Sequence, residues 1–295
     1  MYVTTGATGN IGKVLVESLC RMGLEVRAVG RDEQRLRPAV QQGAQAFIGD
    51  VHNVQSLTRA FAGATVVFTL IPPDPRAPNY RAYQNSIVDS FVQAIRGAGV
   101  KSVVNLSSLG AQIAERVGPV GGFYDAEHRL DAISGLNILH LRPGYFMENN
   151  LMGLELIKAQ GIFGTPIEPQ IAFPMIAAGD VGAYAAMRMA AMDFSGTSVQ
   201  ELFGERDLSM AEVTRIMGAA IGNPGLPYIQ FAYDEAKKAI LGMGASDNVA
   251  DMYVELYRSI NEGILRPTQP RSPATTTPTS FEKWTQTVFL PIYRS

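Results

Sequence analysis

The sequence predicts an α/β fold, a doubly wound parallel sheet followed by a smaller, mostly helical C-terminal lobe. Short apolar runs alternate with helical patterns in the first half, and this alternation stops after Arg142-Pro143-Gly144. A hydrophobic content of 46% over 295 residues also suffices for one large or two unequal cores. We expect a cofactor-binding domain over residues 1–150 and a substrate lobe over residues 151–295, partly interleaved with it.

Six apolar runs of strand length predict the strands of the sheet, and the helical patterns between them predict helices on both faces. The best defined of these helices are Val54 to Phe61 and Tyr80 to Ala98, in which Ile87 and Phe91 recur at helical spacing. The strand runs are Met1 to Thr5, Glu25 to Val29, Ala46 to Ile48, Thr65 to Ile71, Ser102 to Leu106 and Asn137 to Leu141.

Helical patterns dominate the second half, where a Gly/Pro-rich loop is expected from Gly161 to Pro174. Ser209 and Glu212 form a capping box that opens a helix toward Ile221. The stretch from Pro267 to Ser280 is rich in Pro, Thr and Ser and predicts an extended connection. The other expected helices are Leu151 to Ala159, Val181 to Met192, Tyr233 to Leu241, Ala250 to Ile260 and the short Phe281 to Val288.

Composition limits the partners and the compartment. A charged fraction of 18% and a net charge of -2 give no sign of binding to nucleic acid or to a membrane, so we expect a small-molecule substrate. We expect the protein to be a monomer or a homodimer. The single cysteine, Cys20, permits no intrachain disulfide, and no leader or membrane-length apolar run is apparent, so we expect a cytoplasmic protein. No residues have metal-ligand spacing, and His52 and His140 are interpreted as structural.

A dinucleotide-phosphate cradle is predicted by the run Tyr2-Val3-Thr4-Thr5-Gly6-Ala7-Thr8-Gly9-Asn10-Ile11-Gly12, which lies between a strand and a helix. Gly6 allows the sharp turn, Gly9 lets backbone amides approach a pyrophosphate, and Gly12 lets the helix pack closely on its strand. The helix N-terminus then offers free N–H groups and a partial positive charge to the anion. The expected cofactor contacts here are Gly6, Thr8, Gly9, Asn10 and Ile11.

The ends of the second and third strands are expected to meet the adenosine. Arg31 suits the 2′-phosphate of NADP(H), which we therefore prefer, although NAD(H) is possible if Asp32 holds the ribose hydroxyls instead. Asp50 and Val51 are expected to contact the adenine edge and face. The competing role for Asp50 or Asn53 is to cap the helix that follows.

The ends of the later strands are expected to meet the nicotinamide and the substrate. Leu70, Ile71 and Pro72 are expected to form an apolar surface near the topological switch point. Of these residues, Leu70 and Ile71 are expected to contact the cofactor from below. The segment after the last parallel strand combines aromatic rings with amides, which suits a flat, weakly polar substrate, although packing between lobes is the alternative. The expected substrate contacts are Pro72, Tyr145, Phe146 and Asn149.

Together these motifs resemble the short-chain dehydrogenase/reductase superfamily, in particular its atypical NmrA-like branch, which includes NADPH-dependent quinone and triphenylmethane-dye reductases. The resemblance covers nearly the whole chain and implies a Rossmann sheet. It rests on Thr5 to Gly12, Arg31, Gly49-Asp50, Val104 to Ser108, Leu141 to Gly144, Phe146 to Asn149 and Ala178-Gly179-Asp180-Val181.

The resemblance also implies candidate catalytic residues. Ordinary members carry a Ser after the fifth strand and a Tyr-x-x-x-Lys helix, in which Tyr transfers a proton and Lys holds the nicotinamide ribose. Ser107 and Ser108 match the serine, the former expected beside the cofactor and the latter in catalysis, and Tyr124 matches the tyrosine. His128 replaces the lysine and is expected to take part of its role, since its i, i+4 spacing places it beside Tyr124. The alternative is that Tyr124 and His128 only pack at the lobe interface.

We therefore expect an NADPH-dependent reductase that transfers hydride to a small organic acceptor, namely a carbonyl, quinone, imine or activated alkene. Because the fold alone does not determine function, two alternatives remain. One is a non-catalytic NAD(P)-sensing regulator, and the other is a biosynthetic isomerase or cyclase on the same fold.

Overall fold

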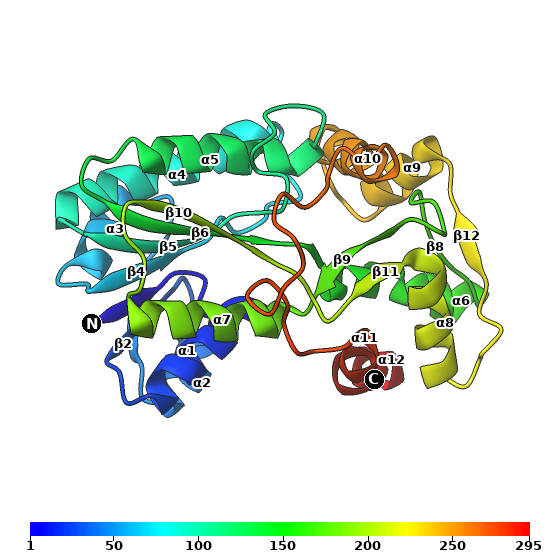
Figure 1. The fold of residues 1–295 in the computed structure, drawn as a ribbon, viewed down its shortest axis with the longest axis horizontal. Helices are drawn as coiled ribbons and strands as arrows, with labels where there is room; N and C mark the ends of the chain where they lie inside the picture. Colours follow the sequence, from blue (N-terminus) through cyan, green and yellow to red (C-terminus); the bar gives the residue numbers. More distant parts are fainter.

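The computed structural model describes residues 1–295 and has a seven-stranded parallel sheet at its centre, with strand order β10-β6-β5-β4-β1-β2-β3 (Figure 1). The chain builds outward from β1 through β2 to β3, then returns to the other side of β1 and continues outward, so the switch point lies between β1 and β4. The predicted fold class is confirmed. The strands are β1 (Tyr2–Thr4), β2 (Val26–Gly30), β3 (Gln45–Ile48), β4 (Val66–Thr69), β5 (Ser102–Leu106), β6 (Asn137–Pro143) and β10 (Thr197–Leu202).

Helices cover both faces of the sheet (Figure 1). Successive strand residues point to opposite faces, so Val66 and Phe68 enter one apolar core while Val67 enters the other. One face carries α1 (Asn10–Arg21), α2 (Glu33–Gln41) and α7 (Ala178–Ala191), and the other carries α3 (Val54–Phe61), α4 (Tyr80–Ala98) and α5 (Gly121–Asp131).

The second half of the chain returns twice to the sheet. Helix α7 packs along α1, and Gly182 permits this because a Cβ there would lie 2.5 Å from the carbonyl oxygen of Ile11. Strand β10 pairs in parallel with β6 and forms an edge of the sheet that the sequence analysis did not predict. The sequence of β10 is polar, yet its Glu201 is 0% exposed and accepts hydrogen bonds from Thr268 and Gln269.

The lobe beyond the carboxyl ends of the strands contains more β-structure than predicted. The region from Gly161 to Pro174, predicted as a loop, includes two short strands, because each of them pairs with a segment distant in sequence. The strands of the lobe are β7 (Tyr145–Phe146), β8 (Phe163–Thr165), β9 (Ala172–Ile176), β11 (Asp207–Ser209) and β12 (Tyr228–Gln230), in the sheets β11-β9-β7 and β12-β8.

The helices of the lobe pack around their own apolar core, which includes Phe281 and Trp284. The predicted capping box is present, since Ser209 Oγ accepts from the Glu212 amide and Glu212 Oε2 accepts from the Ser209 amide. The helices are η2 (Met147–Gly153), α6 (Leu154–Gln160), α8 (Met210–Ala220), α9 (Tyr233–Gly242), α10 (Asp247–Asn261), α11 (Phe281–Trp284), η3 (Thr285–Phe289) and α12 (Leu290–Arg294), and η1 (Gly118–Val120) precedes α5.

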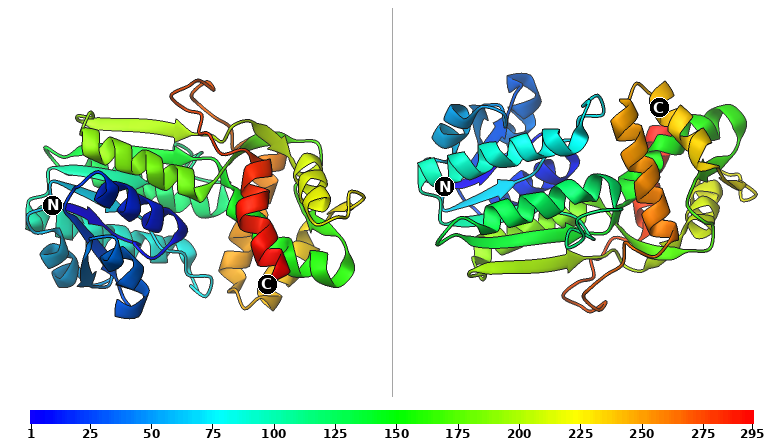
Figure 2. Two further views of the ribbon diagram at one scale, coloured as in Figure 1. Left: turned by 90° about the horizontal axis from the view of Figure 1, so that it is seen from below. Right: turned by 90° about the horizontal axis from the view of Figure 1, so that it is seen from above.

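The segment from 267 to 280 connects α10 to α11 without a helix, as predicted, and makes one isolated bridge between Thr276 and Phe203. Figure 2 shows it looping beside β10 at the edge of the sheet. None of the helices combines the length and the apolar character that crossing a membrane requires.

Candidate cofactor and substrate site

The turn between β1 and α1 is closely packed on one side and open on the other. Gly6 has a φ of 64°, and a Cβ on Gly12 would lie 2.2 Å from the Gly6 carbonyl oxygen, so the turn itself requires both glycines. A Cβ on Gly9 would meet only the Gly6 carbonyl oxygen, at 3.4 Å. The space beside Gly9 is therefore available to a ligand.

The N-terminus of α1 has no side-chain cap. Gly9 occupies the N-cap position and the first turn holds no acidic residue, whereas α2, α3 and α4 are capped by Asp32, Asn53 and Asn79. Uncapped amides at a helix N-terminus attract an anion through their N–H groups and through the helix dipole. Thr8 and Asn10 flank these amides, and Ile11 is buried beneath them. The arrangement fits the pyrophosphate of a dinucleotide.

At the ends of β2 and β3, the structure shows which backbone amides the polar side chains contact. Asp32 Oδ1 accepts hydrogen bonds from the amides of Gln34 and Arg35 at 2.8 and 3.2 Å, so this oxygen caps α2. Asn53 caps α3, and Asp50 instead accepts from the amide of His52 at 3.0 Å. Arg31 is exposed at the end of β2.

Tyr83 of α4 belongs to this edge and was not predicted. Its ring centroid lies 5.5 Å from that of His52, in the turn that holds Asp50 and Val51. Burial raises the pKa of the Tyr83 hydroxyl; the carboxylate of Asp50 also raises it, whereas the charge of Arg31 lowers it. Tyr83 was overlooked because it continues the apolar pattern of a long helix.

The segment Leu70 to Pro72, which follows β4, is held in place by hydrogen bonds from two sides. Thr5 Oγ1 donates to the carbonyl of Phe68 at 3.0 Å and accepts from the amide of Leu70 at 3.2 Å, which ties the ends of β1 and β4 together. The Tyr83 hydroxyl donates to the Pro72 carbonyl at 2.9 Å. Leu70, Pro72 and the intervening Ile71 thus lie half-buried at the switch point.

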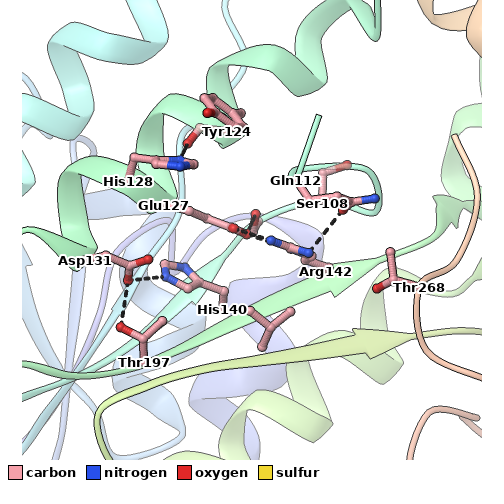
Figure 3. A network of polar contacts seen from close by, with 12 residues as sticks. Ser108, Gln112, Tyr124, Glu127, His128, Asp131, His140, Arg142, Thr197 and Thr268 are labelled. Atoms are coloured by element: carbon pink, nitrogen blue, oxygen red, sulfur yellow. Dashed lines mark hydrogen bonds and ion pairs between the residues drawn. The ribbon is translucent and has the colours of Figure 1, made fainter. Parts of the chain in front are cut away.

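Glu127 and Arg142 form a buried ion pair (Figure 3). Glu127 of α5 accepts from Arg142 Nε at 2.9 Å and from Nη2 at 2.5 Å, and the Ser107 hydroxyl donates to Glu127 at 2.5 Å. Arg142 Nη1 also donates to Gln112 at 3.1 Å. Burial acts to lower the pKa of Arg142, but the hydrogen bonds and charge of Glu127 outweigh it and leave that pKa raised. The network fixes the 107–112 loop on the sheet.

Sequence reasoning missed both members of this ion pair. The available signal was a charged residue within an apolar setting: Arg142 ends a buried strand, and Glu127 follows Ala126 on the side of α5 that faces the sheet. A charge in such a position needs a partner.

Tyr124 and His128 lie side by side, with ring centroids 4.1 Å apart, and His128 Nδ1 donates to the Tyr124 carbonyl at 2.8 Å. In Figure 3 both side chains lie away from the Glu127–Arg142 pair. Ser108 is not joined to them, because its hydroxyl donates to the Leu109 carbonyl at 3.1 Å. The structure therefore brings two of the three predicted catalytic residues together.

His140 belongs to a separate chain of polar groups that crosses the sheet and is buried at Thr69, Asn105 and His140. Its Nδ1 accepts from Asn105 at 3.1 Å, its Nε2 donates to Asp131 at 3.0 Å, and Thr69 donates to Asn105 at 2.9 Å. Burial acts to raise the pKa of Asp131, but hydrogen bonds from His140 and Thr197 outweigh it and lower that pKa. The chain joins β4, β5, β6, α5 and β10.

A cavity of about 650 Å³ opens in the lobe between η2, α6, β8, α9 and α10, and 20 residues line it. Tyr145 and Asn149 belong to its wall, whereas Pro72 and Phe146 do not. Burial raises the pKa of the Tyr145 hydroxyl well above its usual range. Residues such as Phe231 and Tyr257 were missed because the wall is assembled from distant segments. No group of three or more His, Cys, Asp or Glu side chains is placed to hold a metal.

The chain is similar to known proteins over most of its length. The sequence profile of the NmrA-like family matches residues 2–284. The chain is 30% identical to the NAD(P)H azoreductase of Xenophilus azovorans, over 87% of this chain and 86% of the relative. It is 27% identical to quinone oxidoreductase 2 of Escherichia coli K12, over 90% of each chain.

Among solved structures, Citrobacter sp. triphenylmethane reductase complexed with NADP(H) has the same fold, with a TM-score of 0.81 over 97% of this chain and 99% of that one, at 18% identity. The NADPH-dependent quinone oxidoreductase of Escherichia coli complexed with NADPH gives a TM-score of 0.79 over 98% of this chain and 100% of that one, at 22% identity.

Proposed function

The chain belongs to the NmrA-like family and is an NAD(P)H-dependent oxidoreductase, and we propose that it is a reductase that transfers hydride from NADPH to a small organic acceptor. The acceptor class is a carbonyl, quinone, imine or activated alkene. Relatives named for azo compounds and for quinones support a flat, conjugated acceptor. The observation that carries the proposal is the uncapped N-terminus of α1, open beside Gly9 at the switch point of the sheet.

We assign the preference for NADPH to Arg31. Asp32, the acid that would favour NAD, uses one carboxylate oxygen to cap α2. The exposed guanidinium of Arg31 is free to pair with a 2′-phosphate, while Asp50 and Val51 meet the adenine.

When bound, the dinucleotide supplies the hydride, and the protein supplies position and a proton. The amides of residues 9–11 hold the pyrophosphate, and Leu70 and Ile71 support the cofactor from below. Ser107, anchored to Glu127, keeps its loop in place beside the cofactor. Tyr124 donates the proton to a carbonyl acceptor, with Ser108 and His128 in supporting roles.

We divide the chain between these tasks in two parts. Residues 1–150 bind the cofactor together with α7 and β10, which complete the helical layer and the sheet. The remainder of residues 151–295 forms the substrate lobe, whose cavity starts at Tyr145 and Asn149, directly after the last central strand of the sheet.

The test is anaerobic NADPH consumption against a panel of quinones, azo and triphenylmethane dyes, enones and imines, combined with calorimetric titration of NADPH and NADH. We expect oxidation of NADPH by at least one acceptor class, and no oxidation by a Gly9→Val control. Tight NADPH binding without turnover on every class would refute the reductase proposal and favour an NAD(P)-sensing regulator.

A further inference from the structure

Two tyrosine hydroxyls in the wall of the lobe cavity lack hydrogen-bond acceptors. Tyr145 comes from β7 and Tyr257 from α10, and both line the cavity. Neither hydroxyl donates to a protein group, and neither is sealed from solvent, because the unpaired polar atoms that are sealed belong to five other residues. Tyr257 as a whole is only 7% exposed, and Tyr145 is half-buried in the same wall. The accessible surface of the two hydroxyls is therefore that of the cavity.

The other polar groups of the wall are paired, sealed or exposed. Thr165 Oγ1 lies 2.7 Å from the Tyr228 hydroxyl, and the amide oxygen of Asn150 is sealed from solvent. The exposed polar residues of the wall are Glu155, Gln160, Glu235 and Lys238. Inside the cavity, the hydroxyls of Tyr145 and Tyr257 are thus the donors that a ligand can reach.

The surroundings of these hydroxyls keep them protonated and in need of an acceptor. Burial raises the pKa of both, and the charge of Tyr257 acts to raise the pKa of Tyr145 further. Hydrogen bonding from the side chain of Asn149 opposes the rise in the pKa of Tyr145 without reversing it. An amide that donates to Tyr145 uses a lone pair of the phenol oxygen and leaves the O–H proton free.

The rest of the wall is suited to a flat apolar ring. Phe163 and Phe231 contribute aromatic faces, and Leu156 and Met243 add adaptable apolar surface. A volume of about 650 Å³ lies within the range of ligand pockets, about 300–1,000 Å³. A cavity of this size accepts a molecule of about two or three fused rings.

We propose that Tyr145 and Tyr257 determine the specificity for the acceptor substrate, and that their hydroxyls donate hydrogen bonds to the carbonyl oxygens of a flat, conjugated ring ketone or quinone. The proposal rests on the proposed reductase function only in naming the occupant as the substrate. A hydrocarbon with the same rings leaves both hydroxyls without an acceptor, and sites with buried polar groups discriminate strongly against such analogues.

The test compares two probe pairs that differ by one carbonyl group, 9-fluorenone against fluorene and 1-tetralone against tetralin. Equilibrium dialysis measures the binding of each probe to the full-length wild type and to Tyr145→Phe/Tyr257→Phe. We expect the double variant to bind each ketone about fivefold or more weakly and to bind each hydrocarbon at least as tightly as the wild type does. Each single variant should show part of this loss.

The variants are suited to the test because each keeps its ring and loses no hydrogen bond donated to a protein group. Tyr253→Phe is the matched control, since Tyr253 lies one turn earlier on α10, burial likewise raises its pKa, and it does not line the cavity. It should leave the affinities of all four probes unchanged.

The infrared carbonyl band of bound 9-fluorenone provides a second measurement. Donation from the hydroxyls should place this band at lower wavenumber in the wild type than in the double variant. The proposal would be overturned if no probe binds, if the double variant binds the ketones as tightly as the wild type does, or if the ketones and the hydrocarbons weaken equally.

These measurements require neither NADPH nor turnover. Failure of the probes to discriminate would therefore leave the reductase assay untouched. Failure of that assay would in turn leave the carbonyl preference of Tyr145 and Tyr257 as measured.

Discussion

The buried Glu127–Arg142 pair predicts a strongly non-additive response to mutation. Their side chains are 6% and 10% exposed, and two hydrogen bonds join them. Glu127→Leu leaves the guanidinium without this carboxylate, and the nearby Glu201 is already held by Thr268 and Gln269. Because breaking a buried pair leaves an uncompensated charge, we expect either Glu127→Leu or Arg142→Met to lower the free energy of unfolding by about 3–5 kcal/mol.

The double variant Glu127→Leu/Arg142→Met should lose much less than the sum of the two single variants. It removes both charges, and the remaining cost is the loss of the partner of the buried Ser107 hydroxyl, about 1–3 kcal/mol, because the exposed Gln112 amide can bond to water instead. Urea denaturation with linear extrapolation measures all three variants. Additive losses would show that the pair carries no coupling energy, and the reasoning would fail.

An exposed ion pair provides the matched control. Arg206 and Glu282 have side chains 36% and 50% exposed. Removal of either partner should change the free energy of unfolding by about 1 kcal/mol or less, because solvent screens the pair. Losses equal to those at Glu127 would mean that burial is not the cause of the difference.

Four further predictions concern the cofactor site, the proton donor and pH. Gly9→Val should abolish dinucleotide binding in a folded protein, because Gly9 has φ −87° and ψ 174°, which valine adopts readily, and its Cβ enters the open space; unchanged calorimetric affinity would rule out the cradle. Arg31→Ala should weaken NADPH by about 1.5–3 kcal/mol and spare NADH, and equal weakening of both would refute the 2′-phosphate contact. Tyr124→Phe should slow single-turnover reduction of a carbonyl acceptor by roughly 10²–10⁴-fold with NADPH affinity intact, and full activity would exclude the acid role. Burial raises the pKa of Glu148, so its contribution to stability is complete below the pKa of the unfolded state and is lost as pH rises through the pKa of the folded state. The free energy of unfolding of Glu148→Gln, measured by urea titration, should therefore increase relative to that of the wild type as pH rises. A difference between the two proteins that stays constant with pH would contradict this.

Local patterns predicted most of the central sheet. Helices α3 and α4 occupy the predicted residues, and the six predicted strands are present with ends shifted by at most about two residues. The edge strand β10 was missed because Gln200 and Glu201 find partners in the 268–269 segment rather than in water. That pairing joins residues nearly seventy positions apart, which no local pattern reports.

The candidate site likewise combines features set by local sequence with features set by the packing of distant segments. The glycine turn is local, and its geometry follows from adjacent residues. The partners of Glu127 and the wall of the lobe cavity depend on how separate elements pack, so the sequence could not reveal them. Tyr124 and His128 were placed together by helical spacing, but their direction relative to Arg142 is set by the rotation of α5 on the sheet.

The close packing of α7 on α1 has a consequence for how the protein holds together. A chain cut after residue 150 would lose both α7 and β10, leaving an apolar helix face and the unpaired edge of β6 open to aggregation. The two lobes are thus expected to unfold as one cooperative unit. A dinucleotide that binds at the N-terminus of α1 would then protect the distant lobe from proteolysis as well, by mass action on the shared folding equilibrium.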